Sequence, residues 1–284
     1  MNYKKIDPKK NDVVSIYHLL ISGVSPRPIA FVSSLDNNKN VNLAPFSFYN
    51  AFGANPPIIG FSPALSGRTG LPKDTLLNIR ETEEFSVSVV TTDIVDQVSL
   101  SSCEFDRNVD EFVKSGLTKK KLDIINSPGV EESPFIMECK LLKIIELGNK
   151  PASGNLILGE VLMFHIKESV LDDKGRIDLK KIDQVGRSGG PWYTEVKNSL
   201  FKIDKPKGIG VGFDKIPAFV LNSSLRGSEL SKLANIQKIP SQKNEIDKID
   251  FNYEEFILKL KDLINKNQIT QAWNLIISWN SKNE

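Results

Sequence analysis

Arg27 stands between two prolines in the segment SPRPIAFVSS (25–34), where its side chain could bind an anion. Each proline fixes its own backbone angle φ and restricts the residue before it, so the guanidinium is presented from a stiff segment. A guanidinium held in this way suits a phosphate or a carboxylate. For Arg27 taken alone, a surface arginine in a proline turn is the alternative interpretation.

The segment NLAPFSFYNAF (42–52) mixes polar residues with proline, alanine and aromatic residues. Asn42, Ser47 and Asn50 could meet the polar edge of a planar heteroaromatic ligand while the apolar residues contact the rest of its ring. A small residue such as Ala44 lets the backbone approach such a ligand closely. The alternative is a half-buried strand with turn-forming asparagines at its ends.

A third polar segment, SGRTGLPKDT (66–75), precedes a short helix that the spacing of apolar residues predicts over 75–83. The unpaired backbone N–H groups and the positive dipole end of a helix start attract phosphate. Arg68 and Lys73 would add charge there, and Thr75 would add a hydroxyl donor. An ordinary loop that contains a lysine is the alternative.

The loop GRSGGPWY (186–193) joins an arginine, a glycine pair and two aromatic residues. It could form a lid over a ring, or a tight turn in which Trp192 is buried. The sequence contains no GxSxG, GxxxxGK[ST], HExxH or CxxC motif, so the common nucleophilic, nucleotide and metal machineries are not indicated.

The two cysteines and the two histidines suggest structural roles. Cys103 and Cys139 have no metal spacing to a histidine, and we expect both to be core thiols. We likewise expect His18 and His165 to be structural, because an imidazole can be satisfied in a core by one hydrogen bond. No metal site is predicted.

The 284-residue chain has 37 Lys and Arg against 35 Asp and Glu, a formal net charge of +2. So balanced a charge predicts neither a nucleic acid nor an anionic membrane as a partner. The first residues lack the layout of a signal peptide, and no apolar run approaches the length that spans a bilayer. A cytoplasmic protein is therefore expected.

Hydrophobic patterning predicts mainly strands, with helix-like spacing at 93–105 and 109–116. Both faces of the segment 155–171 are apolar, as a closed barrel or a dimer interface would require. Strands at short spacing, without one helix between each pair, favour an antiparallel β-barrel. The expected strands are 29–35, 41–52, 58–65, 85–91, 134–147 and 155–171.

The C-terminal part of the chain has a different composition. Residues 236–250 are rich in Lys, Gln, Asn and Asp and predict a solvated linker, whereas 251–264 and 269–280 predict two amphipathic helices. We therefore expect one domain over 1–235, followed by a linker and helical extension over 236–284. The tail helices would pack on the barrel or across a dimer, or would dock a partner.

Four segments occur together in the first third of the chain: SPRPIAFVSS, NLAPFSFYN, the pair Pro56-Pro57, and KDTLLNIRETEEFSVSV (73–89). In order and spacing they resemble the flavin reductase-like family of FMN-binding split-barrel proteins, the group that includes flavoredoxin. The loop 186–193 is similar to the family's Arg-Leu-Gly-Gly loop, with Ser188 in place of leucine. Residues 210–235 are similar to its C-terminal segment, with Leu-Arg-Gly-Ser-Glu-Leu where relatives often read Leu-Thr-Gly-Asn-Asp-Leu.

This resemblance implies a mainly β fold with helices: a six-stranded antiparallel Greek-key split barrel that forms a homodimer and binds FMN near the dimer interface. By position, Arg27, Ser47, Lys73 and Thr75 would serve the phosphate and ribityl region, and the loop 186–193 would border the exposed face of the ring. The residues implied as cofactor-binding are Arg27, Asn42, Ala44, Pro45, Phe46, Ser47, Phe48, Asn50, Ser62, Lys73, Asp74, Thr75, Arg187, Gly189 and Tyr193.

The activity that the resemblance implies is that of an FMN-binding oxidoreductase, an NAD(P)H-dependent flavin reductase in which hydride passes to N5 of the flavin. The cofactor would carry this chemistry, so no catalytic residue is assigned. The alternative is a non-enzymatic, flavoredoxin-like FMN electron carrier that works with an electron-accepting protein. A third hypothesis keeps the barrel but assigns it another ligand.

Overall fold

The structure, a computed structural model, describes residues 2–203, 206, 208–241 and 252–283 of the chain. These residues group into two compact units, Met1–Leu200 and Phe201–Glu284.

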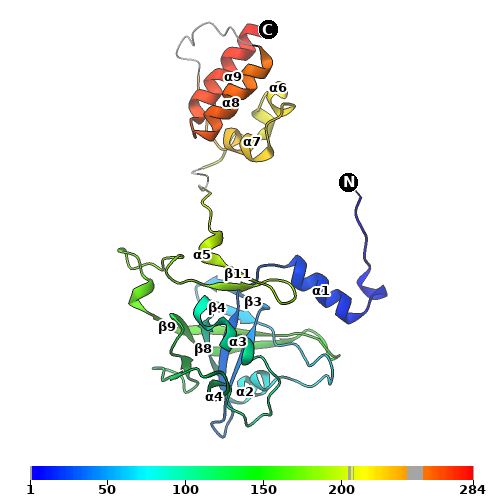
Figure 1. Ribbon diagram of the computed structural model, residues 1–284, viewed down its shortest axis with the longest axis vertical. Coiled ribbons are helices and arrows are strands. Elements are labelled where there is room, and N and C mark those ends of the chain that lie inside the picture. Colours follow the sequence, from blue (N-terminus) through cyan, green and yellow to red (C-terminus); the bar gives the residue numbers. More distant parts are fainter. Residues whose placement is uncertain (1, 204–205, 207, 242–251, 284) are drawn as a thin grey trace. The chain divides into compact units, whose positions relative to one another are not determined.

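The larger unit is built on one seven-stranded sheet in which all neighbouring strands are antiparallel (Figure 1). The strand order is β2-β1-β5-β8-β9-β4-β3. The strands are β1 (Ala30–Leu35), β2 (Val41–Phe46), β3 (Tyr49–Ala54), β4 (Pro57–Phe61), β5 (Glu84–Val89), β8 (Phe135–Glu146) and β9 (Asn155–Ile166).

Strands β2 and β3 lie at opposite ends of this order, yet only Ser47 and Phe48 separate them in the chain. The two edges of the sheet therefore meet, and the sheet closes into a barrel. The single strand predicted over 41–52 is broken at these two residues. Counted as one bent strand, β2 and β3 leave the six strands that were predicted, so the split barrel is confirmed.

The barrel interior is filled by alternate residues of its strands and by helix α2 (Asp74–Thr82), which matches the helix expected over 75–83. Phe61 of β4 and Phe85 of β5 are fully buried and lie edge to face with ring centroids 5.5 Å apart. Leu76 and Ile79 of α2 belong to the same cluster. Burial of this apolar face fixes the position of α2, and therefore of its first turn.

The opposite face of β1 and β2 is covered as well. Phe31 and Leu43 point away from the barrel interior and pack with Val98 of α3 (Val95–Leu100) and Phe112 of α4 (Glu111–Ser115). Both faces of β1 are therefore buried, and a slip by one residue would exchange the side chains of two differently packed cores.

The remaining elements of this unit are short or lie outside the sheet. These elements are η1 (Pro8–Lys10), α1 (Val13–Gly23), η2 (Thr92–Ile94), β6 (Lys119–Lys120), β7 (Gly129–Val130), η3 (Glu168–Val170), β10 (Val185–Arg187), β11 (Tyr193–Glu195) and α5 (Val196–Ser199).

No helix among the described residues is both long and apolar enough to cross a membrane.

The smaller unit contains η4 (Phe213–Lys215), α6 (Ala218–Leu221), α7 (Gly227–Ala234), α8 (Tyr253–Asn265) and α9 (Ile269–Asn283). Val220, Leu233, Phe256 and Trp273 share its core, and the indole nitrogen of Trp273 donates to the Leu233 carbonyl at 3.0 Å.

This packing places the division between the units at 200/201, whereas the sequence analysis predicted it at 235/236. Residues 218–234 join the tail helices because those helices bury their apolar stripes against them. Trp273 and Ile276 are therefore core residues and not parts of a docking surface. Most of the linker predicted over 236–250 lies outside the described residues.

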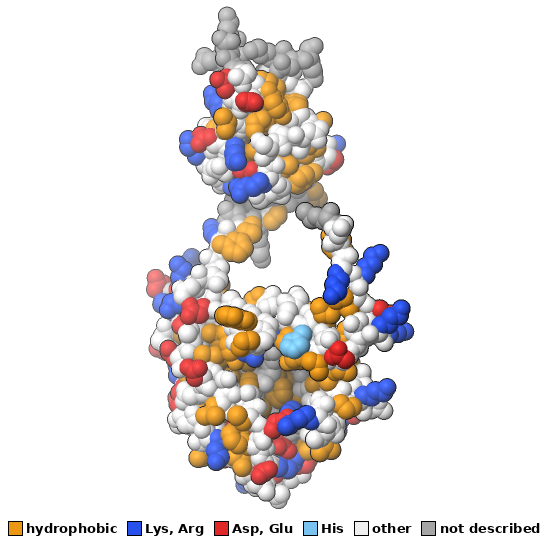
Figure 2. All heavy atoms as spheres, turned by 45° about the vertical axis from the view of Figure 1, so that its right-hand side comes forward, with side chains coloured by type: hydrophobic (Ala, Val, Ile, Leu, Met, Phe, Trp, Pro, Cys, Tyr) orange, Lys and Arg blue, Asp and Glu red, His pale blue; other side chains and the backbone are white. Residues whose placement is uncertain are grey.

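Figure 2 shows hydrophobic side chains at the surface among charged side chains of both signs. Cys139 is buried as expected, whereas Cys103, which was also expected in the core, is exposed. Trp192 is 72% exposed, which rules out the alternative of a tight turn with a buried Trp192. Cys103 and Trp192 each follow a turn rather than a regular strand or helix, so no periodicity could indicate which way their side chains point.

Candidate functional site

A cavity of about 360 Å³ lies where the start of α2 meets strand β2 and the segment Ser101–Phe105 that follows α3. We call it the Lys73 cavity. It brings together seven of the residues that the sequence analysis singled out: Asn42, Ala44, Pro45, Phe46, Lys73, Asp74 and Thr75.

The first turn of α2 presents hydrogen-bond donors at this cavity. Lys73 is the N-cap residue of the helix, and its side chain makes no capping hydrogen bond. Its carbonyl accepts from the amides of Leu76 and Leu77, whereas those of Asp74 and Thr75 have no acceptor among the described residues. Unpaired amides at the positive end of a helix attract an anion.

Asn42 ties strand β2 to this helix start. Its Nδ2 donates to Oγ1 of Thr75 at 2.8 Å, and both side chains are buried. The bond fixes the amide and the hydroxyl, so the polar groups of two elements lie at one wall of the cavity. Both residues keep the site assignment that the sequence suggested, although they bind each other in the structure.

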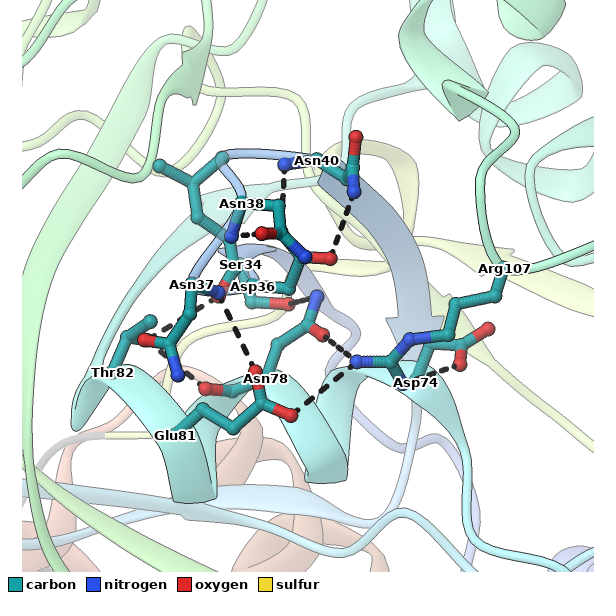
Figure 3. A network of polar contacts seen from close by, with 11 residues as sticks. Ser34, Asp36, Asn37, Asn38, Asn40, Asp74, Asn78, Glu81, Thr82 and Arg107 are labelled. Atoms are coloured by element: carbon teal, nitrogen blue, oxygen red, sulfur yellow. Dashed lines mark hydrogen bonds and ion pairs between the residues drawn. The ribbon is translucent and has the colours of Figure 1, made fainter.

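Arg107 contacts three residues of α2 (Figure 3). Its guanidinium lies 3.1 Å from Oδ1 of Asp74 and 3.5 Å from Oε1 of Glu81, and it donates to Oδ1 of Asn78 at 3.3 Å. Asn78 in turn donates to Oγ of Ser34 on β1 at 3.2 Å. The network fixes the helix start on the barrel and pairs the Asp74 carboxylate with a cation.

Glu111 is a buried carboxylate at the same cavity. It is 7% exposed, and its Oε2 accepts from the Leu43 amide at 2.9 Å. Burial raises the pKa of Glu111, because the charged form loses its hydration. Neither Glu111 nor the segment Ser101–Phe105 was singled out from the sequence. Only the folded chain brings these residues to β2, so no local pattern could have indicated them.

Arg27 has a different environment from the one predicted. It is 5% exposed, and its Nη1 donates to the carbonyls of Ile21 and Val24 at the end of α1, both at 2.5 Å. Its Nε donates to Oγ of Ser47 at 3.3 Å, and its guanidinium carbon lies 5.8 Å from the ring centroid of Phe48. These contacts tie the guanidinium to the end of α1, and Arg27 does not line the Lys73 cavity, so its predicted phosphate role stays a prediction.

The loop 186–193 packs against the same region. Arg187 pairs with Arg27 through backbone hydrogen bonds of 2.9 and 2.8 Å, and its guanidinium carbon lies 4.4 Å from the ring centroid of Tyr193. A Cβ atom at Gly189 would come within 2.6 Å of Oγ of Ser22, so any other residue there would require the Ser22 side chain to move. Within the described chain, Arg187, Gly189 and Tyr193 do not line the Lys73 cavity.

A second cavity, of about 520 Å³, lies beside Arg27 and is mostly apolar. We call it the apolar cavity. Asn50 and Tyr49 line it together with Ile58, Phe135 and other apolar side chains. Burial raises the pKa of the Tyr49 hydroxyl. The predicted residue Ser62 lines neither cavity, and its amide donates to the Phe48 carbonyl at 2.8 Å.

The closed antiparallel barrel, with the uncapped start of α2 beside it, defines a protein of the split-barrel class. The sequence model of the Flavin reductase like domain matches residues 22–178, more than half of the chain. The chain therefore belongs to the flavin reductase-like family, and the predicted resemblance is confirmed.

Three relatives extend this finding. An uncharacterized protein of Halalkalibacterium halodurans is 36% identical over 206 residues, which are 71% of this chain and 96% of that one. The crystal structure of nitrilotriacetate monooxygenase component B from Bacillus cereus matches with a TM-score of 0.67 and 30% identity over 72% of this chain and 100% of that one. The 2-nitrobenzoate 2-nitroreductase NbaA of Pseudomonas fluorescens matches with a TM-score of 0.64 and 29% identity, covering 72% and 97%. More than a quarter of this chain lies outside each match.

A flavin mononucleotide needs an anion site at one end and flat apolar contacts with backbone polar groups at the other. The Lys73 cavity offers the amides of Asp74 and Thr75 and the Lys73 ammonium at one wall, and Ala44, Pro45 and Phe46 of β2 at another. The donor set therefore fits FMN. The family and its neighbours support a flavin cofactor for this chain.

Proposed function

We propose that this chain binds FMN in the Lys73 cavity and works as an NAD(P)H-dependent flavin reductase. One observation carries the proposal: strand β2 and the uncapped start of α2 converge on one cavity, with a lysine at its edge. The nicotinamide donor and the cytoplasmic location are proposed from the family resemblance and the sequence, as is the absence of nucleic-acid and membrane partners.

The residues of the chain would bind and orient the cofactor. The amides of Asp74 and Thr75, together with the Lys73 ammonium, would hold the phosphate through charge-assisted hydrogen bonds. Ala44, Pro45 and Phe46 would contact the ring and exclude water from it. When bound, FMN supplies a ring that accepts hydride from a nicotinamide, a step for which the chain needs no acid or base.

A homodimer is also proposed, from the apolar side chains that one strand leaves in water. Leu162, Met163, Phe164 and Ile166 of β9 are 37%, 40%, 47% and 38% exposed in the single chain. Leu162, Phe164 and Ile166 share one face of the strand, because side chains alternate along it, and an exposed apolar patch of this kind marks an interaction surface. Sedimentation velocity should show a dimer, and a monomer at micromolar concentration would refute this proposal.

Titration with FMN, followed by anaerobic stopped-flow mixing with NADH or NADPH, tests the function. We expect saturable FMN binding and fast bleaching of the bound flavin by at least one nicotinamide. Absence of FMN binding would remove the proposal. Binding without bleaching would instead favour the electron carrier that passes electrons to a protein partner.

A further inference from the structure

Glu104 binds the cation that the proposed phosphate site needs. Its Oε1 lies 2.9 Å from Nζ of Lys73, and its Oε2 is paired with the Arg68 guanidinium. Lys73 is the only basic residue among the described residues that line the Lys73 cavity. One carboxylate therefore pairs with both basic side chains of the loop that leads into α2.

The other acidic residues of the cavity are held by different partners. Asp74 is paired with Arg107 at 3.1 Å, as Figure 3 shows, and Glu111 accepts from the Leu43 amide at 2.9 Å. Glu104 differs because its partners are the basic side chains of the 66–75 loop. It comes from the segment Ser101–Phe105, which lines the cavity together with Lys73.

We propose that Glu104 is a built-in competitor for the phosphate of FMN. Its carboxylate occupies Lys73 and Arg68 in the empty protein, and the phosphate displaces it when FMN binds. This inference rests on the proposed function, and it concerns how tightly the flavin is held. An internal competitor weakens binding and speeds dissociation, so it favours an FMN that exchanges with solution over one that is permanently bound.

Either the Glu104 carboxylate or the phosphate of FMN can pair with Lys73 and Arg68. The side chains of Glu104 and Lys73 are 47% and 40% exposed, so the carboxylate can turn into water without a large desolvation cost. A phosphate has more acceptor oxygens and more negative charge than a carboxylate, and it also reaches the amides of α2. Hydrogen bonds from Lys73 and Arg68 lower the pKa of Glu104, so the competitor is charged at neutral pH.

Glu104→Gln tests this inference, with Glu146→Gln as the matched control. Glu146 is also an exposed glutamate in an ion pair, with Arg80 at 2.5 Å, but it does not line the cavity. We expect Glu104→Gln to lower the Kd for FMN by about threefold to tenfold and to slow FMN dissociation, since exposed ion pairs have modest strength. Riboflavin, which lacks the phosphate, should show no change. Because salt screens exposed charges, the gain should shrink at high ionic strength.

The outcomes separate this inference from the proposed function. If the unaltered protein binds no FMN, the proposed function fails and this inference fails with it. If the unaltered protein binds FMN but Glu104→Gln leaves its affinity unchanged or weaker, the function stands and the competitor role is overturned. An equal gain for riboflavin, or the same gain in Glu146→Gln, would also overturn it.

Discussion

Arg27 and Lys73 have the same sign of charge, and the family resemblance placed both at the phosphate and ribityl region of FMN, but their environments in the structure differ. Arg27 is 5% exposed and binds two backbone carbonyls at the end of α1. The Lys73 side chain is 40% exposed and binds the carboxylate of Glu104. A buried cation must give up its bonds to backbone oxygens to meet a ligand, whereas Lys73 shares its charge with one half-exposed carboxylate.

Glu138 is the acidic counterpart of Arg27. It is fully buried and accepts from the amides of Asp123, Ile124 and Ile125 at 3.1, 2.7 and 2.8 Å, and His165 lies 2.6 Å away. The structural role predicted for His165 is consistent with this contact. The comparison therefore indicates that buried charges in this barrel stabilise the fold, and that the exposed ion pairs around the Lys73 cavity are available for binding.

The largest expected effect is that of Arg27→Ala. Removal of the guanidinium leaves the carbonyls of Ile21 and Val24 without their donor, so we expect the free energy of unfolding to fall by about 2–4 kcal/mol. Urea denaturation measures the change. The control Arg176→Ala removes an exposed arginine paired with Asp172 and should cost less than about 1 kcal/mol. Equal effects of the two substitutions would break the distinction between buried and exposed charge.

Glu138→Gln tests the distinction between buried and exposed charge through the pH dependence of the free energy of unfolding. The amide that replaces one oxygen would face backbone N–H donors, and we expect a loss of about 2–3 kcal/mol in the free energy of unfolding at neutral pH.

Burial alone would raise the pKa of Glu138, but hydrogen bonds from His165 and the three amides outweigh it, and the net pKa is lowered from its ordinary value of 4.5. A lowered folded-state pKa gives stability that is present above the ordinary value and is lost as the pH falls through the folded value. Denaturation at a series of acidic pH values should therefore show the mutant and the unaltered protein converging below pH 4.5. A constant difference would mean that the carboxylate charge is not the stabilising feature. Glu168→Gln, on exposed η3, should change nothing.

Of these three substitutions, Lys73→Ala has the smallest expected effect, and this effect is on FMN binding. We expect FMN affinity to fall by about 1–2 kcal/mol, the scale of one charge-assisted hydrogen bond, with unfolding unchanged. Fluorescence titration with FMN and riboflavin measures it, and Lys174→Ala in an exposed turn is the control. Unchanged FMN affinity in Lys73→Ala would show that the phosphate lies elsewhere.

The fold was predictable from the sequence where a pattern is local. The alternation of apolar and polar residues in 29–35 and 85–91 predicted β1 and β5. The spacing of apolar residues in 75–83 predicted α2 to within one residue at each end. The same approach failed at Ser47 and Phe48, because alternation does not show where a long strand bends out of one edge of a sheet and into the other. It also failed at the 235/236 boundary, where only packing shows that α7 belongs with α8 and α9.

The candidate site was predictable only in its segments. Asn42, Ala44 and Thr75 were singled out by residue type beside a strand or a helix start, and the structure brings them together. The contacts of Arg27 were not predictable, because nothing in SPRPIA shows that the end of α1 lies within reach of its guanidinium. Glu104 was missed because its partners lie 31 and 36 residues away in the chain.

Most of the barrel strands, the helix start at Lys73 and the family could be recognised from short runs of residue types. Which charges are buried against backbone oxygens and which are exposed beside a cavity became clear only from the folded chain. The physical reason is that the role of a charge depends on its burial and on its partner, and both come from distant segments that folding brings together.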